Sequence, residues 1–221
     1  MRSRRESALS GRAPEERAGR VEILATVLLA LAAVATAWSS YQASRWNGEQ
    51  AKAFSRGNAA RIESTRASSL ATAQTQVDVA TFMQWVNAYA LGQERLATFY
   101  VRRFRDEFKP AVNAWVATKP VRNPHAPLTP FAMPQYKLAA SRDAARLEAE
   151  AEAWSAKGRT DVQRATNYVL GVVLFAASLF FAGMSTKLRT SRLRLALLSV
   201  GVAMFVGAAV WLATQPTSVS V

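Results

Sequence analysis

Three long apolar runs divide the chain. They cover residues 21–39, 166–185 and 195–213, and Glu22 is the only charged residue in them. About 20 apolar residues in a helix cross the hydrocarbon core of a bilayer, which is about 30 Å thick. We therefore predict three transmembrane helices, with residues 40–165 forming a domain between the first and the second.

This domain is predicted to begin with a helix that continues from the first span, because residues 41–104 contain no proline. Apolar residues then recur every three or four positions, which indicates an amphipathic helix packed on a partner. They are Val79, Phe82, Val86, Tyr89, Gln93, Leu96 and Tyr100, with only Gln93 polar, and Asp78 lies among polar residues on the opposite face. The helix either folds back near Gly57 or continues, and we favour a continuous helix.

A second helix, over residues 138–165, is predicted to return to the second span. A heptad-like row of positions runs along it, and such a row is typical of a helix that packs on another helix. The row consists of Ala140, Ala144, Leu147, Ala151, Trp154, Gly158, Asp161 and Ala165. The expected fold is all-α: three transmembrane helices, with an external helical hairpin or coiled-coil-like bundle that continues from spans one and two.

A proline-rich segment joins the two external helices. Pro110 suits the first turn of a short helix that ends near Thr118. The loop 119–136 contains five prolines, which favour an extended path. Its candidate interaction surface comprises Pro127, Pro130, Phe131, Met133, Pro134 and Tyr136. The alternative, which we favour, is that this loop covers the apolar tip of the helices.

Charge predicts the orientation of the spans. The tail 1–20 and the loop 186–194 are basic, so the positive-inside rule places both in the cytoplasm. Residues 40–165 and the tail 214–221 then lie outside, in the periplasm or extracellular space. Aromatic residues expected to anchor the outer interface are Trp38, Tyr41, Tyr168 and Trp211. We expect the tail 1–20 to be disordered and the first span to be an uncleaved anchor, although a cleaved signal peptide is the alternative.

The third span carries a row of small residues at every fourth position, namely Ser199, Ala203 and Gly207. Such a row allows two membrane helices to approach closely, although alanine-rich spans also show this spacing by chance. The second and third spans contain no acidic or basic residue, whereas a proton or ion pathway normally needs such groups at depth. Transport would therefore require an oligomer.

The chain offers little catalytic chemistry. It has no cysteine and only one histidine, His125, so thiolate sites and histidine-pair metal sites are excluded. Asp106, Glu107 and Asp143 have basic neighbours and are expected to form surface ion pairs. The net charge of +13 is not gathered in one patch, which argues against nucleic acid. We predict no enzyme activity, no cofactor and no metal site.

Two motifs resemble a family of uncharacterised bacterial inner-membrane proteins. The first is W-x-x-Y-Q-A, from Trp38 to Ala43, directly after the first span. The second is A-P-x-x-P-F-x-M-P-x-Y, from Ala126 to Tyr136, and the stretch 111–115 adds to the likeness. The resemblance implies a bacterial membrane protein with this hairpin architecture. It implies no activity, cofactor or catalytic residue.

Three functional hypotheses remain. The first is a non-enzymatic structural or interaction subunit, embedded in the lipid bilayer, whose external hairpin binds another envelope protein or itself. The second is a sensory or regulatory module that responds to an external ligand through helices continuing into the membrane. The third is a subunit of an oligomeric transporter or channel. We favour the first, because amphipathic helices without site chemistry indicate binding to a protein or to a second copy.

Overall fold

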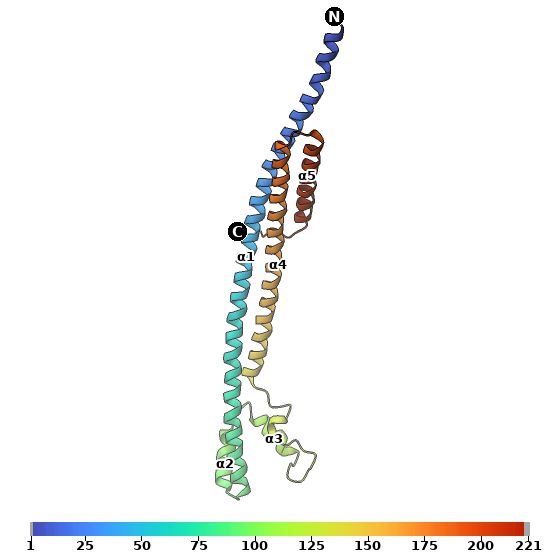
Figure 1. The fold of residues 1–221 in the computed structure, drawn as a ribbon. Coiled ribbons are helices and arrows are strands. Elements are labelled where there is room, and N and C mark those ends of the chain that lie inside the picture. The colour runs from blue at the N-terminus through green and yellow to red at the C-terminus, as the bar shows by residue number, and fades with distance from the viewer. Residues whose placement is uncertain (1, 219–221) are drawn as a thin grey trace. The chain divides into compact units, whose positions relative to one another are not determined.

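The protein is all-helical in the part of the chain that the structure describes. The structure is a computed structural model that describes residues 2–218, with side chains described from Val21 onward. Its elements are α1 (Arg2–Ala90), α2 (Glu94–Arg103), α3 (Lys109–Ala117), the 3-10 helix η1 (Pro130–Ala132), α4 (Ala139–Lys187) and α5 (Ser191–Ala213) (Figure 1). Among these residues there is no strand, which confirms the all-α prediction.

The chain divides into two compact units. Unit 1 contains residues 2–53 and 156–218 of the described chain, and unit 2 contains residues 54–155. Helices α1 and α4 contribute to both units, whereas α5 belongs to unit 1 and α2, α3 and η1 belong to unit 2. All three predicted spans therefore fall in unit 1, and the proline-rich segment falls in unit 2.

Three helices are long and apolar enough to cross a membrane, and they are the ones that contain the predicted spans. The runs 21–39, 166–185 and 195–213 lie inside α1, α4 and α5 respectively. Helix α4 is unbroken, so the return helix leads directly into the second span, as predicted. These features identify a membrane protein.

The backbone of the N-terminal tail differs from our expectation. Helix α1 begins at Arg2, whereas the sequence predicted disorder over residues 1–20. Arg, Glu and Ala, which are frequent in this tail, are good helix formers, and this favours the helical backbone. The side chains of residues 1–20 lie outside the described part, so no packing can be assigned to them.

In unit 1, α4 and α5 approach each other closely at Gly201. The hydroxyl of Ser178 on α4 donates a hydrogen bond to the carbonyl oxygen of Gly201 at 2.8 Å. A Cβ at position 201 would lie 3.3 Å from the carbonyl oxygen of Ser178. Helix α1 joins them in an apolar cluster made of Ala25, Leu28, Ala182 and Leu198. Small residues therefore set the helix spacing in unit 1.

The small-residue face predicted on the third span is not the face that packs within this chain. Ser199, Ala203 and Gly207 are exposed, and nothing lies within 4 Å of a Cβ placed at Gly207. The buried residues of α5 are instead Leu198, Gly201 and Ala208. Both faces contain small residues, and the contact forms where Gly201 meets Ser178. Spacing alone could not distinguish the two faces.

In unit 2, α1 packs antiparallel to α4 through small residues. The hydroxyl of Ser64 donates to the carbonyl oxygen of Ala144 at 2.9 Å. A Cβ at Gly57 would lie 3.2 Å from the carbonyl oxygen of Ala151. Between these contacts, Arg61 forms ion pairs with Glu148 at 3.5 Å and with Glu152 at 3.7 Å. The helix is continuous through Gly57, as we favoured, and this glycine serves close packing.

The row of positions predicted on the return helix is confirmed as the inward face of α4. Every one of its eight residues is buried or half-buried: Ala140, Ala144, Leu147, Ala151, Trp154, Gly158, Asp161 and Ala165. Asp161, the one charged member, has no exposed side-chain surface and pairs with Lys157 at 2.8 Å and Arg164 at 3.1 Å. The burial of α4 was therefore readable from spacing alone.

Helix α1 ends earlier than predicted, at Ala90. Gly92 adopts a left-handed backbone with φ of +67°. The N–H of Gln93 donates to the carbonyl oxygen of Ala88, and that of Gly92 donates to the carbonyl oxygen of Tyr89. These two bonds define a Schellman motif, which stops a helix and suits glycine. The single helix expected through Phe104 is therefore two helices, α1 and α2, with a tight turn between them.

The apolar row predicted on this part of α1 was also wrong. Among Val79, Phe82, Val86, Tyr89, Gln93, Leu96 and Tyr100, only Phe82 is buried, and Tyr100 is half-buried. The inward face of α1 instead carries Asp78, Phe82, Trp85 and Ala88. The turn at Gly92 interrupts the pattern, and the inward face follows the small residues that precede it. Val79, Val86 and Tyr89 are left exposed.

The segment that joins α2 to α4 contains the predicted short helix. Pro110 lies in the first turn of α3, and Thr118 follows its last residue. The loop after α3 differs from the extended path that its prolines suggested. It consists of turns closed by backbone hydrogen bonds, followed by η1. Local hydrogen bonding therefore decides its course.

Filling the close contact at Gly57 tests how the unit 2 hairpin is packed. We expect Gly57→Leu to lower the free energy of unfolding by about 1–3 kcal/mol, because the added side chain must push α1 away from Ala151. Gly48→Leu is the matched control, since nothing lies within 4 Å of a Cβ there and leucine favours a helix. Thermal unfolding followed by circular dichroism measures both. Equal melting temperatures for the two variants would contradict this packing.

Candidate functional site

An aromatic core organises the end of unit 2 that holds α2, α3 and η1. Phe82 of α1, Phe104 and Phe108 form its buried centre with Ala111 and Val112 of α3. Phe108 is completely buried and stacks on Phe131, with ring centroids 5.0 Å apart. The half-buried members around this centre are Trp85, Trp115, Phe131, Met133 and Tyr136. Several rings meet edge to face, which adds to the stability gained from burial.

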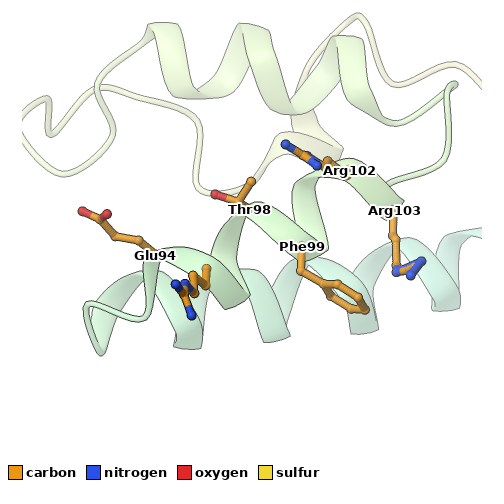
Figure 2. A pocket seen from close by; sticks show the side chains of 6 residues that line it. Glu94, Thr98, Phe99, Arg102 and Arg103 are labelled. Carbon is orange, nitrogen blue, oxygen red and sulfur yellow. The ribbon is translucent and has the colours of Figure 1, made fainter.

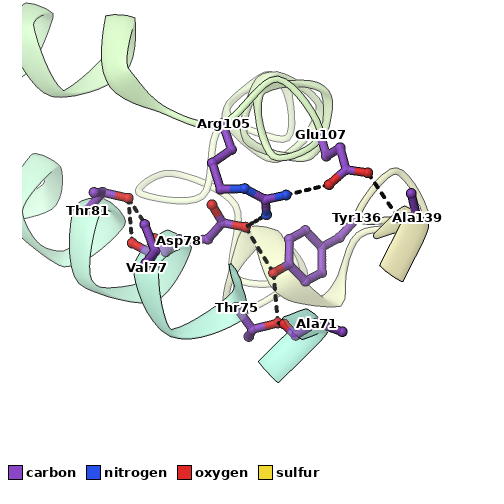
Figure 3. A network of polar contacts seen from close by, with 9 residues as sticks. All are labelled: Ala71, Thr75, Val77, Asp78, Thr81, Arg105, Glu107, Tyr136 and Ala139. Atoms are coloured by element: carbon purple, nitrogen blue, oxygen red, sulfur yellow. Dashed lines mark hydrogen bonds and ion pairs between the residues drawn. The ribbon is translucent and has the colours of Figure 1, made fainter. Parts of the chain in front are cut away.

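A buried carboxylate, that of Asp78, lies beside this core. Its side chain has no exposed surface. One oxygen, Oδ2, accepts a hydrogen bond from Arg105 at 2.9 Å and another from the hydroxyl of Tyr136 at 3.2 Å, as Figure 3 shows. The other oxygen, Oδ1, has no hydrogen-bond partner. Asp78 therefore links α1 to two segments that lie 27 and 58 residues further along the chain.

Arg105 also reaches a second carboxylate. Its other terminal nitrogen donates to Glu107. Glu107 in turn accepts, at 2.9 Å, the backbone N–H of Ala139, the first residue of α4 (Figure 3). The first N–H groups of a helix lack partners within the helix, so Glu107 satisfies one of them with a negative charge. The network thus joins α1, the α2–α3 linker, the loop and the start of α4.

The surroundings of the two carboxyl groups shift their pKa values in opposite directions. Burial raises the pKa of Asp78, an effect that the charge and hydrogen bonds of Arg105 and the hydroxyl of Tyr136 oppose. The N–H of Ala139 lowers the pKa of Glu107, and Arg105 lowers it further. Burial also raises the pKa of the Tyr136 phenol. The folded structure therefore favours the protonated form of Asp78 and the ionised form of Glu107, each relative to the free side chain.

This geometry supports a structural role for the network. The side chain of Asp78 is enclosed by protein. No cluster of three His, Asp or Glu side chains in the described chain is arranged to hold a metal ion. A buried acid whose charge is matched by Arg105 holds segments in register, because separating the pair would leave a buried charge uncompensated.

The predicted interaction surface of the proline-rich loop is largely turned inward. Pro130 is buried, whereas Phe131, Met133 and Tyr136 are half-buried against the aromatic core. The carbonyl oxygen of Pro127 accepts the indole N–H of Trp115 at 2.7 Å. Pro134 is exposed. These contacts favour the alternative interpretation, in which this part of the loop covers the apolar tip of the helices.

The aromatic residues predicted at the outer membrane interface differ in exposure. Trp38 and Tyr41 are exposed and Trp211 is half-buried, as an anchor requires. Tyr168 is buried instead, and its hydroxyl donates to the carbonyl oxygen of Pro216 at 3.3 Å. Tyr168 therefore packs within unit 1 and does not face the lipid headgroups. Its place in the sequence, at the end of an apolar run, fits both settings.

The remaining candidates are ordinary surface residues. Asp106 pairs with Lys109 at 2.7 Å, and Asp143 pairs with Arg146 at 3.5 Å. His125 lies in an exposed turn, where its backbone N–H donates to the side chain of Asn123. The surface pairing expected for the two aspartates is confirmed by these contacts.

A shallow hollow on α2 is a further feature that could receive a ligand. Its lining comes from α2 alone: Glu94, Arg95, Thr98, Phe99, Arg102 and Arg103. The guanidinium of Arg103 lies over the ring of Phe99, 4.1 Å from its centroid, and Figure 2 shows these side chains along one side of the helix. Small-molecule sites are usually concave and enclosed by several elements. This hollow is an exposed helix surface.

Sequence reasoning missed Asp78 as the centre of the network and placed it on the polar face. One signal could have revealed it. Asp78 is the only charged residue between Arg66 and Glu94. A lone acid in an uncharged run, three or four residues from Thr75 and Phe82 on one helix face, is a candidate for burial with a distant partner. The identity of that partner, Arg105, was not readable from spacing.

No protein-family model, curated protein or solved structure matches the chain. The class of protein therefore rests on the fold alone. It is an all-α membrane protein with three helices able to span a bilayer, and unit 2 carries a network of buried polar contacts.

The raised pKa of Asp78 makes the stability of unit 2 depend on pH. A group with a raised pKa in the folded state contributes stability that is present at low pH and lost as the pH rises through that pKa. The neutral variant Asp78→Asn lacks this dependence. We therefore expect its stability relative to the unaltered protein to improve as the pH rises from below the ordinary aspartate pKa of about 3.9 through the raised pKa of Asp78. Thermal unfolding at several pH values measures this, and a constant difference would contradict the assignment.

Glu107→Gln is the matched control, because the pKa of Glu107 is shifted in the opposite direction to that of Asp78. The lowered pKa of Glu107 means that its stabilisation is present at neutral pH and lost as the pH falls through that pKa. We expect this variant to be destabilised at neutral pH, and the deficit to shrink on acidification. If the stability of both variants, relative to the unaltered protein, changed with pH in the same direction, a global effect of pH would be the cause, and the two assignments would be contradicted.

Proposed function

We propose that the protein is a non-enzymatic interaction subunit of the bacterial inner membrane, whose external helical segment binds another envelope protein or a second copy of itself. In this proposal residues 1–20 and the loop 186–194 are cytoplasmic, and residues 40–165 and 214–221 are external. The resemblance of the two motifs to uncharacterised bacterial inner-membrane proteins supports the compartment. The function rests on the surface of unit 2.

Charge supports the orientation. Between the second and third spans, four cations stand without an acid: Lys187, Arg189, Arg192 and Arg194. Cytoplasmic loops of membrane proteins carry such an excess of Lys and Arg. Trp38 and Tyr41 are exposed at the opposite end of the first span, where aromatic side chains suit the outer interface.

An exposed apolar face on α1 carries the functional proposal. Val79, Met83 and Val86 are spaced by four and three residues, so they lie on one side of the helix. Their exposed fractions are 36%, 59% and 38%, although they lie far outside the predicted span. An apolar helix face of this spacing suits a helix or groove of a partner protein. Part of the row that the sequence predicted to pack inside the chain is therefore available for a partner.

The proposal assigns no catalytic step. Asp78 is the one buried acid of unit 2, and it is held by Arg105 and Tyr136. A general acid or base must reach a proton on a substrate, and a carboxylate enclosed by structural contacts does not. The chemistry of this residue is accounted for by its role in joining segments.

Single cysteines test the orientation, since the chain has no cysteine of its own. We expect Ser141→Cys to react with a membrane-impermeant maleimide in intact cells. Ser191→Cys should react only after the inner membrane is permeabilised, because it follows the basic loop. Both positions are exposed, so burial does not limit labelling. Labelling of Ser191→Cys in intact cells would overturn the topology.

The apolar face is tested with the full-length tagged protein in mild detergent, by pull-down and mass measurement of the intact complex. We expect a stoichiometric partner or a homo-oligomer, and at least about tenfold weaker association for Val79→Ser/Met83→Ser/Val86→Ser. The matched control is Leu70→Ser/Val77→Ser, since both residues are 53% exposed on another side of α1. A monomer without a partner, or equal loss in both variants, would refute the proposal.

A further inference from the structure

The loop between α3 and η1, residues 118–129, exposes two aliphatic side chains almost completely. Val121 is 91% exposed and Leu128 is 93% exposed, the highest values among the large hydrophobic residues of the described chain. Single exposed aliphatic residues are common on soluble surfaces and need no explanation. Two of them at the tips of one short loop, outside the predicted spans, are a distinct feature.

The same loop is cationic. Lys119 lies two residues before Val121, Arg122 directly follows it, and both cations are exposed. The surrounding stretch contains no acid between Glu107 and Asp143, whereas it includes Lys109, Lys119, Arg122, Lys137 and Arg142. Lys109 pairs with Asp106, whereas Lys119 and Arg122 lie in the loop itself, which carries no acid, and their charge favours a negatively charged partner.

The loop is held in one shape by local contacts. The carbonyl oxygen of Lys119 accepts the N–H groups of Arg122 at 2.9 Å and Asn123 at 3.0 Å. The indole of Trp115 fixes the other end through Pro127. Lys119 itself has φ of +52°, the one positive φ among the described non-glycine residues. A preformed loop loses little conformational freedom on binding.

We propose that this loop docks on the surface of an anionic phospholipid bilayer. Val121 and Leu128 enter the apolar layer, and Lys119 and Arg122 remain at the level of the phosphate headgroups. Basic residues beside apolar side chains are the pattern of segments that bind at a membrane interface. This surface is separate from the α1 face of the proposed function, and either proposal can fail alone.

The shape of the loop favours lipid over a protein partner. A stable protein interface buries roughly 800 Å² on each partner and needs a complementary surface of many residues. Two aliphatic tips with two cations, on a loop of turns, do not form such a surface. Insertion into a bilayer needs only apolar side chains that can leave water and cations that can meet phosphates.

A fluorescent label reports insertion directly, because the chain has no cysteine. The probe NBD is attached to Val121→Cys or Leu128→Cys in the full chain, held in nanodiscs of neutral phosphatidylcholine. Vesicles of phosphatidylglycerol and phosphatidylcholine, about 3 to 7, are then added. We expect a blue shift and brighter emission at both sites, and no change with vesicles of phosphatidylcholine alone. Leu70→Cys, on an exposed helix surface, is the control and should not respond.

Two further variants separate the charges from the apolar tips. Carrying the Val121→Cys label, Lys119→Gln/Arg122→Gln should shift the vesicle titration to about tenfold more anionic lipid. Without a label, Val121→Ser/Leu128→Ser should reduce co-flotation with the same vesicles. All altered positions are exposed, and circular dichroism checks that the fold is kept. No response at either labelled tip, or an equal response at Leu70→Cys, would overturn the proposal. An equal response with neutral vesicles would overturn its dependence on anionic lipid.

Discussion

The need to compensate one buried charge constrains the organisation of unit 2. An ionised carboxylate without a partner is expensive to bury, so Asp78 can occupy the inside of α1 only with Arg105 beside it. Arg105 reaches that position because α1 ends at Ala90, the chain turns at Gly92, and α2 runs back beside α1 (Figure 1). The same guanidinium orients Glu107, which receives the first N–H of α4. The path of the chain between the two long helices therefore follows from where Asp78 must find its countercharge.

Both units pack their helices by close approach of small residues, and not around a large aliphatic core. In unit 1 Gly201 meets Ser178, and in unit 2 Gly57 meets Ala151. Close backbone contact compensates for the small area that each residue buries, because dispersion contacts fall off steeply with distance. The exception is the aromatic core around Phe108, where large rings fill the space among short elements. Because small residues provide the internal contacts of α1, many of its large apolar side chains remain exposed.

Much of the architecture was predictable because it depends on composition or on a single period. The three spans follow from the length of their apolar runs, and the inward face of α4 follows from its heptad spacing. The prediction for the apolar row on α1 was wrong because it took large apolar side chains as the buried ones. The inward face of α1 instead begins with the small buried residues Gly57, Ala60 and Ser64. The end of α1 was missed because the left-handed turn at Gly92 needs hydrogen bonds that a propensity value does not include. Asp78 was misplaced because its partner is 27 residues away, and no local pattern encodes such a distance.

The Schellman turn at Gly92 also has a consequence for how the chain acquires its structure. Trp85 of α1 contacts Phe104, the residue that follows α2, and these two residues leave the ribosome within a short interval. The contact of Ser64 with Ala144 spans 80 residues and cannot form until α4 has been synthesised. Because local contacts close with less entropy than distant ones, the α1–α2 hairpin is placed to form first. It would then present a nearly finished aromatic surface to α3 and the loop, while the alanine, glycine and serine face of α1 stays open until the last helix of the unit arrives.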